Sequence, residues 1–228
     1  MNTQAPAKPY LSDSGLLQVH SMFLTIQGEG PLAGTPAIFI RLFGCNLQCL
    51  MCDTDYTSNC DTLTIDDVLD FVLENGLSVP LVVITGGEPF RQNITPLCVL
   101  LLHHGYAVQV ETNGTLPPSD NLPDDVMIVC SPKTGSVNHL LQDRIFAYKY
   151  VLHADHTDAL GLPASVLQHH AKPHVAKPHV GFKGDIFLTP LDSGDPEENK
   201  RHLENTIDSC LTFGYRLCIQ LHKIIGLE

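Results

Sequence analysis

Short runs of apolar residues alternate along the chain with stretches in which apolar residues recur at helical spacing. Residues 81–84, Leu-Val-Val-Ile, form a continuous, mostly β-branched run of the kind found in a strand covered on both faces. Residues 64–67, Thr-Ile-Asp-Asp, are typical of a capped helix start, and helical spacing then continues until Gly76. The pattern predicts strands at residues 16–26, 37–43, 81–84, 107–110, 126–130, 146–152, 185–188 and 215–221, and helices at residues 65–75, 94–104 and 196–213.

Strands that alternate with helices or crossover loops predict a largely parallel sheet. A complete eight-unit barrel takes about 250 residues, and only about six such strands are readable here. We therefore expect an α/β fold of the open, partial (β/α) barrel type with about six largely parallel strands. Residues 16–228 would form a single domain, and residues 1–15, which contain Pro and Ser with little periodicity, would be a loose N-terminal tail.

Composition narrows the class of protein. With 228 residues and an apolar content of 43%, the chain can bury one sizeable core. Its net charge of −12 disfavours a polyanionic partner, so we expect a small-molecule substrate and no nucleic acid. No apolar run approaches the length of a membrane span, so no membrane partner is expected. Eight cysteines in such a chain indicate reduced thiols and hence a cytoplasmic location.

Residues 44–54 place Cys45, Cys49 and Cys52 at C-x3-C-x2-C spacing in one short loop. Four thiolates saturate the irons of an iron–sulfur cube, so three thiolates leave one iron open for a substrate or cofactor. The alternatives are a zinc knuckle and a disulfide cluster. Structural zinc sites need four ligands, usually as two separated pairs, and no second C-x2-C follows. The spacing therefore favours a cube with an open iron.

Polar or glycine-containing signatures end several predicted strands, and sites in parallel barrels collect at that edge. Gly86 and Gly87 let backbone approach a ligand closely, and Glu88 can accept a hydrogen bond from an ammonium group. Arg41 lies in an apolar strand that leads straight into the cysteine loop, so it is a member of an ion pair or, as we favour, a ligand for a carboxylate. The signatures are residues 27–31, 85–89, 111–115, 131–133 and 189–192.

The cysteine loop together with the Thr-Gly-Gly-Glu-Pro sequence at residues 85–89 resembles the radical S-adenosylmethionine (SAM) superfamily. Over residues 23–228 the chain further resembles the 7-carboxy-7-deazaguanine synthase family. The stretches that carry this resemblance are residues 25–30, 39–41, 45–54, 85–89, 111–115, 131–133 and 222–223.

The resemblance implies a radical SAM partial barrel and a carbon–nitrogen lyase of queuosine biosynthesis. Such a lyase would convert 6-carboxy-5,6,7,8-tetrahydropterin to 7-carboxy-7-deazaguanine with release of ammonia, using no general acid/base pair at its first step. The implied cofactors are a 4Fe-4S cluster, SAM as a recyclable radical source, and Mg2+. Besides the pterin, the expected partners are an electron donor such as flavodoxin or ferredoxin and a second copy of the chain in a homodimer.

Carried over position by position, the resemblance assigns residues to each ligand. The cluster would be bound by Cys45, Cys49 and Cys52, and Mg2+ by the hydroxyl of Thr54, which could otherwise simply cap the loop. SAM would contact Gly87, Ser131, Pro132, Lys133 and the turn Thr189, Pro190, Leu191 and Asp192. The pterin would contact Ile26, Gln27, Gly28, Arg41, Thr85, Glu111, His222 and the terminal α-carboxylate of Glu228.

Two stretches depart from the family pattern. Thr189 stands where the family has glutamine, which puts the SAM contact of that turn in question. The chain end has Leu221 in place of threonine and Glu228 as its last residue, so a shifted substrate is conceivable. The residues beyond the last strand would either dock the terminal carboxylate on the pterin or form a disordered tail.

Other interpretations stay open at this point. An activase that installs a glycyl radical on a partner protein would share the cysteine loop, and a zinc or iron–sulfur scaffold module would be indifferent to SAM. The repeated Ala-Lys-Pro-His-Val of residues 171–180 could bind metal, but its prolines are more typical of a solvated loop. Four cysteines outside the motif are interpreted as small core residues, and Cys60 as an unassigned loop residue; the four are Cys98, Cys130, Cys210 and Cys218.

Overall fold

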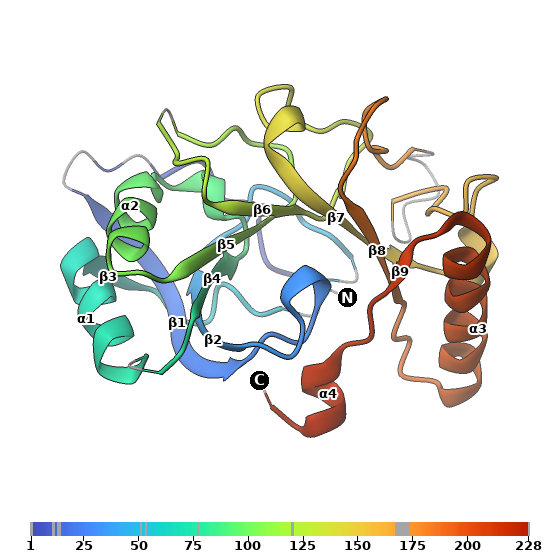
Figure 1. Cartoon of the computed structure of the whole chain (residues 1–228), viewed down its shortest axis with the longest axis horizontal. Coiled ribbons are helices and arrows are strands. Elements are labelled where there is room, and N and C mark those ends of the chain that lie inside the picture. The colour runs from blue at the N-terminus through green and yellow to red at the C-terminus, as the bar shows by residue number, and fades with distance from the viewer. Residues whose placement is uncertain are drawn as a thin grey trace.

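The computed structural model describes residues 2–10, 12, 15–50, 52, 54–76, 78–119, 121–166 and 174–227. The strands of this part form one sheet in the order β3-β1-β2-β4-β5-β6-β7-β8-β9 (Figure 1). The strands are β1 (Leu16–Ile26), β2 (Pro36–Leu42), β3 (Asp61–Thr64), β4 (Leu81–Gly86), β5 (Ala107–Thr112), β6 (Met127–Cys130), β7 (Ile145–Leu152), β8 (Asp185–Pro190) and β9 (Arg216–Leu217). The helices are α1 (Ile65–Asn75), α2 (Thr95–His103), α3 (Pro196–Phe213) and α4 (Leu221–Ile225), with the short 3-10 helices η1 (Gly30–Leu32), η2 (Pro89–Arg91), η3 (Gln142–Arg144) and η4 (Ala154–His156).

The largely parallel sheet expected from the sequence is confirmed. From β2 through β4 and on to β9, each strand pairs with its neighbour in parallel, whereas β1 pairs with β2 and β3 in antiparallel orientation. Helices α1 and α2 make the crossovers that lead into β4 and β5, and α3 leads into β9. In Figure 1 the sheet curves between α1 and α2 at one end and α3 at the other, as expected for an open, partial barrel.

The ends of the main helices show the local signals that the sequence predicted. Thr64 Oγ1 accepts a hydrogen bond from Asp67 N at 3.1 Å, and the Asp67 carboxylate accepts one from Thr64 N at 2.9 Å. This reciprocal capping box satisfies backbone donors that the first turn of α1 would otherwise leave open. At α3, Asp195 caps the first turn and Gly214 ends the helix with φ 76°, a conformation that favours glycine.

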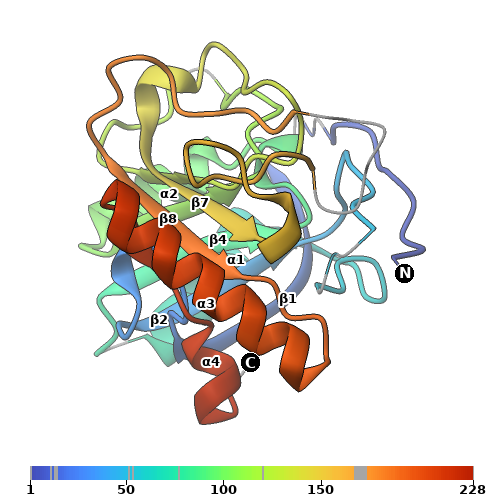
Figure 2. The same cartoon turned by 90° about the vertical axis from the view of Figure 1, so that its right-hand side faces the viewer.

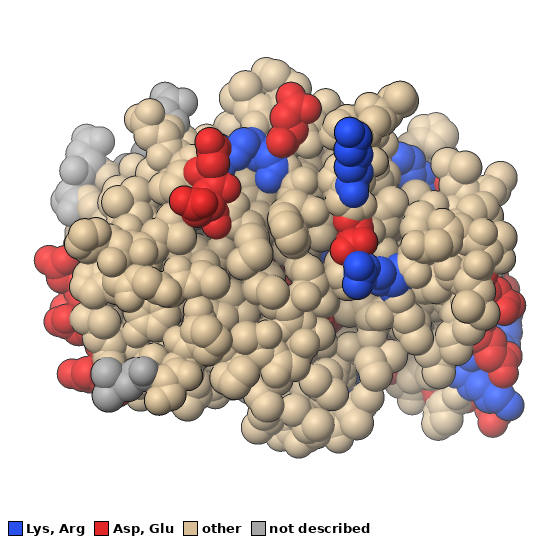
Figure 3. Space-filling model, viewed as in Figure 1, with Lys and Arg blue, Asp and Glu red and all other residues tan. Residues whose placement is uncertain are grey.

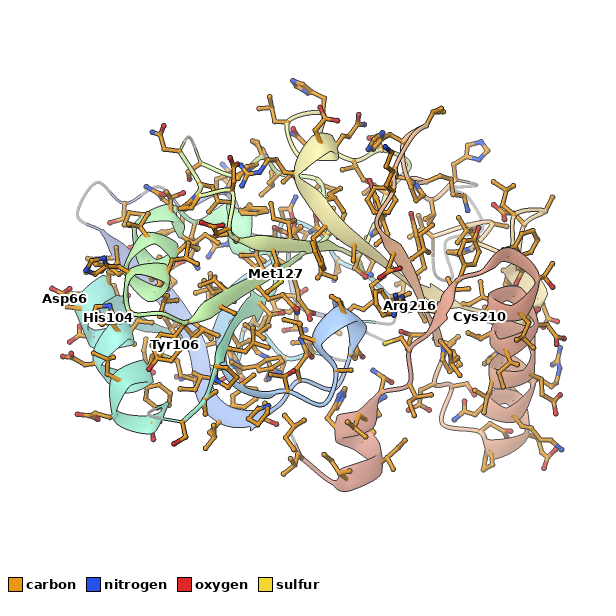
Figure 4. The ribbon with its side chains drawn as sticks, viewed as in Figure 1. Asp66, His104, Tyr106, Met127, Cys210 and Arg216 are labelled. Carbon is orange, nitrogen blue, oxygen red and sulfur yellow. The ribbon has the colours of Figure 1, made fainter. Side chains whose placement is uncertain are left out.

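Side chains of paired residues on parallel strands point to the same face, so the strand register separates two faces of the sheet. One face carries residues such as Ile40, Ile84 and Val110, which pack with apolar residues of α1 and α2 in the main core. The opposite face has a smaller apolar floor around Val83, against which Met127 packs (labelled in Figure 4). Farther along the same strands, this second face becomes polar.

Two segments of the sheet differ from the expectation. Residues 61–64 form the short strand β3, and the strand expected at residues 215–221 is reduced to β9. Cys218 N still donates to Leu188 O at 2.8 Å, but Leu221 N donates to Gly28 O at 3.0 Å. The second bond draws the chain away from the sheet, so that residues expected to form a tail form α4 instead.

Residues 2–10 differ from the expected loose tail. They lie along the cysteine loop, beside which Figure 2 shows the N-terminal end of the chain. Asn2 N donates to Leu50 O at 3.1 Å, and Tyr10 N donates to Arg91 O at 2.7 Å. These partners lie far away in the sequence, which is why local composition gives no sign of them.

The described part of the histidine-rich stretch is buried where the two repeats meet and exposed at His174 and Val180. Residues 167–173 lie outside the described residues. Val175, which ends the first repeat, and Ala176, which begins the second, are buried, and Ala176 N donates to Thr134 O at 2.8 Å. The second repeat is therefore not solvated over its whole length.

Charge is unevenly distributed over the surface. In the view of Figure 3, acidic side chains gather over α1 at one end, acidic and basic side chains lie together over α3 and across the upper middle, and the lower middle carries few charges. Exposed apolar side chains include Leu24 near the end of β1 and Ile224 on α4. Among the described residues, we find no helix of the length and apolar character that a membrane span requires.

Candidate active site

The signatures that follow the parallel strands meet at one edge of the sheet, as the sequence predicted. Residues 27–31 were expected there too, but they follow the antiparallel strand β1, whose last residue, Ile26, pairs with Pro36 at the start of β2. Leu42 at the end of β2 pairs with Gly86 at the end of β4. Thr112 at the end of β5 pairs with Cys130 at the end of β6. The loops that begin after these residues therefore start side by side, and they include the cysteine loop and residues 131–133.

Cys45, Cys49 and Cys52 lie on the connection from β2 to β3, just beyond the end of β2. Cys45 is buried, and the other two thiols are partly exposed. Two N–H donors point at the sulfur of Cys45: Leu47 N at 3.4 Å and Asn113 Nδ2 at 3.9 Å. Donors aimed at a sulfur stabilise its thiolate form, which is the form that binds iron.

The donor set fits a cluster better than a single ion. Burial raises the pKa of the Cys45 thiol to about 11, so a nearby cation such as iron is needed to make it a thiolate at neutral pH. All eight cysteines lie in the described part and are free thiols, which leaves the disulfide alternative without support. In that part, no three His, Cys, Asp or Glu side chains converge as a site for one metal ion. The thiolates of a cube bind different irons, so a cluster loop does not require such convergence.

Gly87 brings the loop after β4 into backbone contact with the cysteine loop. A Cβ atom on Gly87 would lie 2.1 Å from Gly44 O, and Glu88 N donates to that same oxygen at 3.0 Å. Glu88 was expected to accept from a ligand's ammonium group, but its buried carboxyl group instead accepts from Phe90 N at 3.0 Å and Asn113 N at 2.7 Å. Burial raises the pKa of Glu88 to about 7 in spite of these bonds. Glu88 therefore joins the loops after β4 and β5.

Lys149 on β7 is buried and pairs with two carboxylates. Its Nζ lies 2.5 Å from Glu29 Oε2 and 3.0 Å from Glu111 Oε2. Gln27 Nε2 and Gln109 Nε2 donate to the other oxygen of Glu111 at 3.1 and 3.0 Å. Burial works to raise the pKa of Glu29, but the ammonium of Lys149 outweighs it and holds that pKa at about 2. In turn, burial works to lower the pKa of Lys149, and the two carboxylates outweigh it and raise that pKa.

Arg41, Thr85 and Glu111 lie next to one another across three strands. Arg41 pairs with Thr85 between β2 and β4. Ile84 and Val110, which directly precede Thr85 and Glu111, pair between β4 and β5. The three side chains therefore form a row on the face of the sheet that is turned away from the main core. The structure thus brings together three of the residues that the resemblance assigned to the pterin.

The loop after β1 contacts the C-terminal segment. Gln220 Nε2 donates to Glu29 Oε1 at 2.8 Å. A Cβ atom on Gly28 would lie 2.1 Å from Nδ1 of His222, so only glycine leaves room for that imidazole ring. Ile26, the last residue of β1, leads into this loop. Glu228, whose terminal carboxylate was assigned to the pterin, lies outside the described residues.

The residues assigned to SAM after β6 lie between the cysteine loop and the ion pairs. Lys133 Nζ donates to Ser131 Oγ at 2.8 Å, and Ser131 Oγ donates to Lys149 O at 2.9 Å. Pro132 between them is buried. Burial raises the pKa of the Cys49 thiol, and the nearby charge of Lys133 opposes that effect. The ammonium group of Lys133 is therefore close enough to act on the cysteine loop.

The turn after β8 borders a small hollow. Lys223 Nζ donates to Asp192 Oδ2 at 2.8 Å, and this bond contributes most to a pKa of about 2 for Asp192. The hollow has a volume of about 200 Å³. Pockets for drug-sized ligands measure about 300–1,000 Å³, so this hollow could hold only part of SAM. Its lining residues are Thr189, Pro190, Leu191, Asp192, Asn199, Leu203, Ile219 and Gln220.

The sequence analysis did not assign Glu29 or Lys149 to the site. Lys149 carries the same signal that singled out Arg41, which is a charged residue inside an otherwise apolar strand. Glu29 directly follows Gln27 and Gly28, which were assigned to the pterin. Nothing in the sequence distinguishes it, and its role becomes visible only in its contacts with Lys149 and Gln220.

Comparisons with known proteins agree with this geometry. Residues 39–129 match the family model described as the radical SAM superfamily. The chain is 42% identical over 231 aligned residues to the 7-carboxy-7-deazaguanine synthase of Rhodospirillum rubrum, covering 97% of each chain. It is 38% identical to the 7-carboxy-7-deazaguanine synthase of Rickettsia prowazekii, covering 98% of this chain and 94% of that protein.

The fold is also found among solved structures. The crystal structure of QueE from Escherichia coli matches with a TM-score of 0.70 at 25% sequence identity, over 91% of this chain and 95% of that chain. The match extends over most of both chains, so the open, largely parallel sheet is common to the two proteins as a whole. The expected radical SAM partial barrel is thereby confirmed.

Proposed function

The chain belongs to the 7-carboxy-7-deazaguanine synthase family of radical SAM enzymes, and from this premise we propose that it converts 6-carboxy-5,6,7,8-tetrahydropterin to 7-carboxy-7-deazaguanine, with release of ammonia, in queuosine biosynthesis. The observation that supports the proposal most strongly is the similarity over nearly the whole length of the chain. The hydrogen bond from Gln27 to Glu111 and the close approach of Gly28 to His222 agree with it. The relatives favour this activity over a glycyl-radical activase or a metal-binding scaffold.

Membership of the radical SAM superfamily implies a 4Fe-4S cluster and SAM, and Cys45, Cys49 and Cys52 would hold the cluster. When bound, the cluster and SAM supply the organic radical that this superfamily uses. Gly87 keeps the neighbouring backbone free of a side chain, and the ammonium group of Lys133 would pair with the carboxylate of SAM.

The row across β2, β4 and β5 would bind the pterin. Arg41 offers a bidentate fork that matches the substrate's carboxylate, and Glu111 can accept hydrogen bonds from the guanidine-like edge of the ring. Lys149 donates to one oxygen of the Glu111 carboxylate at 3.0 Å, and Gln27 and Gln109 donate to the other at 3.1 and 3.0 Å. Three donors leave this carboxylate little freedom, so the edge of the ring would meet an acceptor that is already oriented.

Charge balance explains why a metal ion would assist. Two cations, Arg41 and Lys149, and two carboxylates, Glu29 and Glu111, belong to this row and its supports; Lys149 is buried and the other three are partly buried. The substrate's own carboxylate therefore arrives as an additional negative charge. We propose Thr54 as a ligand of Mg2+, whose remaining positions would be filled by substrate oxygens and water, as is usual for this ion.

Four further expectations remain predictions. They are the contact of the Glu228 terminal carboxylate with the pterin, the homodimer, the electron donor of the flavodoxin or ferredoxin type, and the cytoplasmic location. The exposed apolar side chains of Leu24 and Ile224 are compatible with a partner surface near α4.

The proposal is tested by incubating anaerobically reconstituted protein with SAM, a reductant, Mg2+ and the carboxytetrahydropterin, and identifying the products by mass. We expect 7-carboxy-7-deazaguanine and ammonia, formed only when SAM is present. The Cys49→Ala variant is the matched control and should give neither product. Protein that carries a full cluster and responds to SAM, yet leaves the pterin unchanged, would refute the proposed substrate.

A further inference from the structure

Residues 2–10, which we call the N-terminal strap, bond directly to the backbone of two cysteines. Asn2 Nδ2 donates to Cys49 O at 3.0 Å. Ala7 N donates to Cys45 O at 2.7 Å. The strap therefore donates hydrogen bonds to the backbone carbonyl groups of the first two cysteines of the motif. Figure 2 shows the strap running beside the cysteine loop.

Gln4 of the strap holds the residues that follow the last cysteine. Its Nε2 donates to Thr54 O at 2.9 Å, and its Oε1 accepts from Tyr56 N at 2.8 Å. Thr57 Oγ1 donates to the same Oε1 at 3.0 Å. Tyr56 is buried, and its carbonyl oxygen accepts from Gly44 N at 3.0 Å, so Gln4 is linked through Tyr56 to the start of the loop.

Arg91 fixes the far end of the strap to the same loop. The side chain of Arg91 is buried, and its Nη1 donates to Lys8 O at 2.7 Å. Its Nη2 donates to Phe43 O at 2.7 Å, just before the loop begins. One guanidinium group therefore joins the strap to the residue that leads into the cysteine loop.

The cysteine loop needs such support because residues 43–60 contain no helix or strand where the structure describes them. Connections of this length are uncommon in compact domains unless other groups order them. We propose that the strap is part of the cluster site, with Asn2 and Gln4 as positioning residues. They hold the backbone of Cys49 and Thr54 where the cluster, SAM and metal ion require it. This inference rests on the part of the proposed function that concerns the cluster and SAM. It does not depend on the identity of the pterin.

The test compares Asn2→Ala, Gln4→Ala and the double variant with the parent. Thr3→Ala is the matched control, because Thr3 is an exposed residue of the same strap. Two measurements need no turnover. One is the rate at which a ferrous chelator removes iron from the reduced cluster, and the other is the change that SAM causes in the electron paramagnetic resonance spectrum of that cluster.

We expect iron removal on the order of tenfold faster in the double variant, because several hydrogen bonds that keep the loop closed are lost together. Each single variant should show a smaller effect, and the SAM-dependent spectral change should be weaker than in the parent. Thr3→Ala should match the parent in both measurements. Should the double variant fail to fold, the two single variants provide the same comparison.

The thermal unfolding temperature of each protein separates positioning from general stability. Faster iron removal at an unchanged unfolding temperature supports the inference. Iron removal and spectra equal to the parent's would overturn it, and so would faster removal that merely follows a lowered unfolding temperature. A parent protein whose cluster responds to SAM but which makes no deazaguanine refutes the proposed function alone, and the comparison of variants then still tests the strap.

Discussion

Replacing Lys149 by methionine tests how the substrate side of the site is held together. The change keeps a side chain of similar length and removes the ammonium group, which lies 2.5 Å from Glu29 and 3.0 Å from Glu111. Two largely buried carboxylates, with side chains 17% and 18% exposed, would then lose their common cation. Removing one partner of a buried ion pair typically costs about 3–5 kcal/mol, because the remaining charge stays buried without compensation.

The pKa of Glu29 gives a second estimate of the magnitude. It is about 2 in the folded protein against an ordinary value of 4.5, and a depression of that size corresponds to about 3 kcal/mol of stability. This contribution is fully present above pH 4.5 and is lost as the pH falls toward 2. In the variant, burial acts on Glu29 without the opposing cation, so its pKa rises above the ordinary value. The loss of stability relative to the parent should therefore grow as the pH rises through that raised pKa.

Thermal unfolding of the cluster-loaded protein, measured anaerobically at about pH 5 and about pH 7.5, distinguishes these effects. In a chain of this length each kcal/mol shifts the unfolding temperature by about 2–4 °C, so we expect a loss of roughly 6–20 °C at the higher pH and a smaller loss at the lower one. Lys183→Met removes an exposed lysine and should unfold like the parent at both pH values. A Lys149→Met protein with the parent's unfolding temperature, or with equal losses at the two pH values, would refute the reasoning.

Three further changes test the cluster, the metal ligand and the contact between the two ends of the chain. Cys49→Ala should lose iron and turnover because two thiolates cannot hold the cube, whereas Cys98→Ala in the main core should change the unfolding temperature at most; iron analysis and product mass decide. Thr54→Ala should weaken the stimulation of turnover by Mg2+ while iron content and SAM binding stay unchanged, and an equal response to Mg2+ would remove Thr54 from the site. Gly28→Ala should displace His222, whose Nδ1 lies 2.1 Å from the position of the added Cβ, and should raise the KM for the pterin by about tenfold or more with SAM affinity unchanged. An unchanged KM would show that the pterin does not depend on the position of His222.

The features predicted correctly from the sequence are those with local signals. The β-branched run of residues 81–84 became the doubly covered part of β4, and the Thr64–Asp67 pattern became the capping box of α1. The edge of the sheet that carries the site followed from parallel strand order alone, because strand ends in a parallel sheet lie together. The alternation of Gln109 and Glu111 with apolar neighbours on β5 already indicates that these two side chains share one face.

The features that could not be predicted depend on partners far away in the sequence. The alternation in residues 215–221 is typical of a strand, but the bonds from Gln220 and Leu221 to the loop after β1 divert the chain after only two residues of β9. The composition of the first residues is that of a tail, and nothing in it reveals that Asn2 and Gln4 bond to the cysteine loop. For the same reason, the sequence shows that Lys149 is a charged residue in an apolar strand, but it does not show that Glu29 and Glu111 are its partners.

The glycine loop after β1 and the His-Lys pair at the far end of the chain form one structural unit. Gly28 must lack a side chain because the ring of His222 occupies that space. The Glu29 carboxylate then links Lys149 on β7 to Gln220, which fixes the segment that carries His222. The departure at residue 221 leaves this unit intact, because the bond from Leu221 to Gly28 O at 3.0 Å is donated by backbone N and does not require a threonine side chain. A change of substrate would therefore have to come from side chains that face the ligand, and not from loss of the contact between the two ends of the chain.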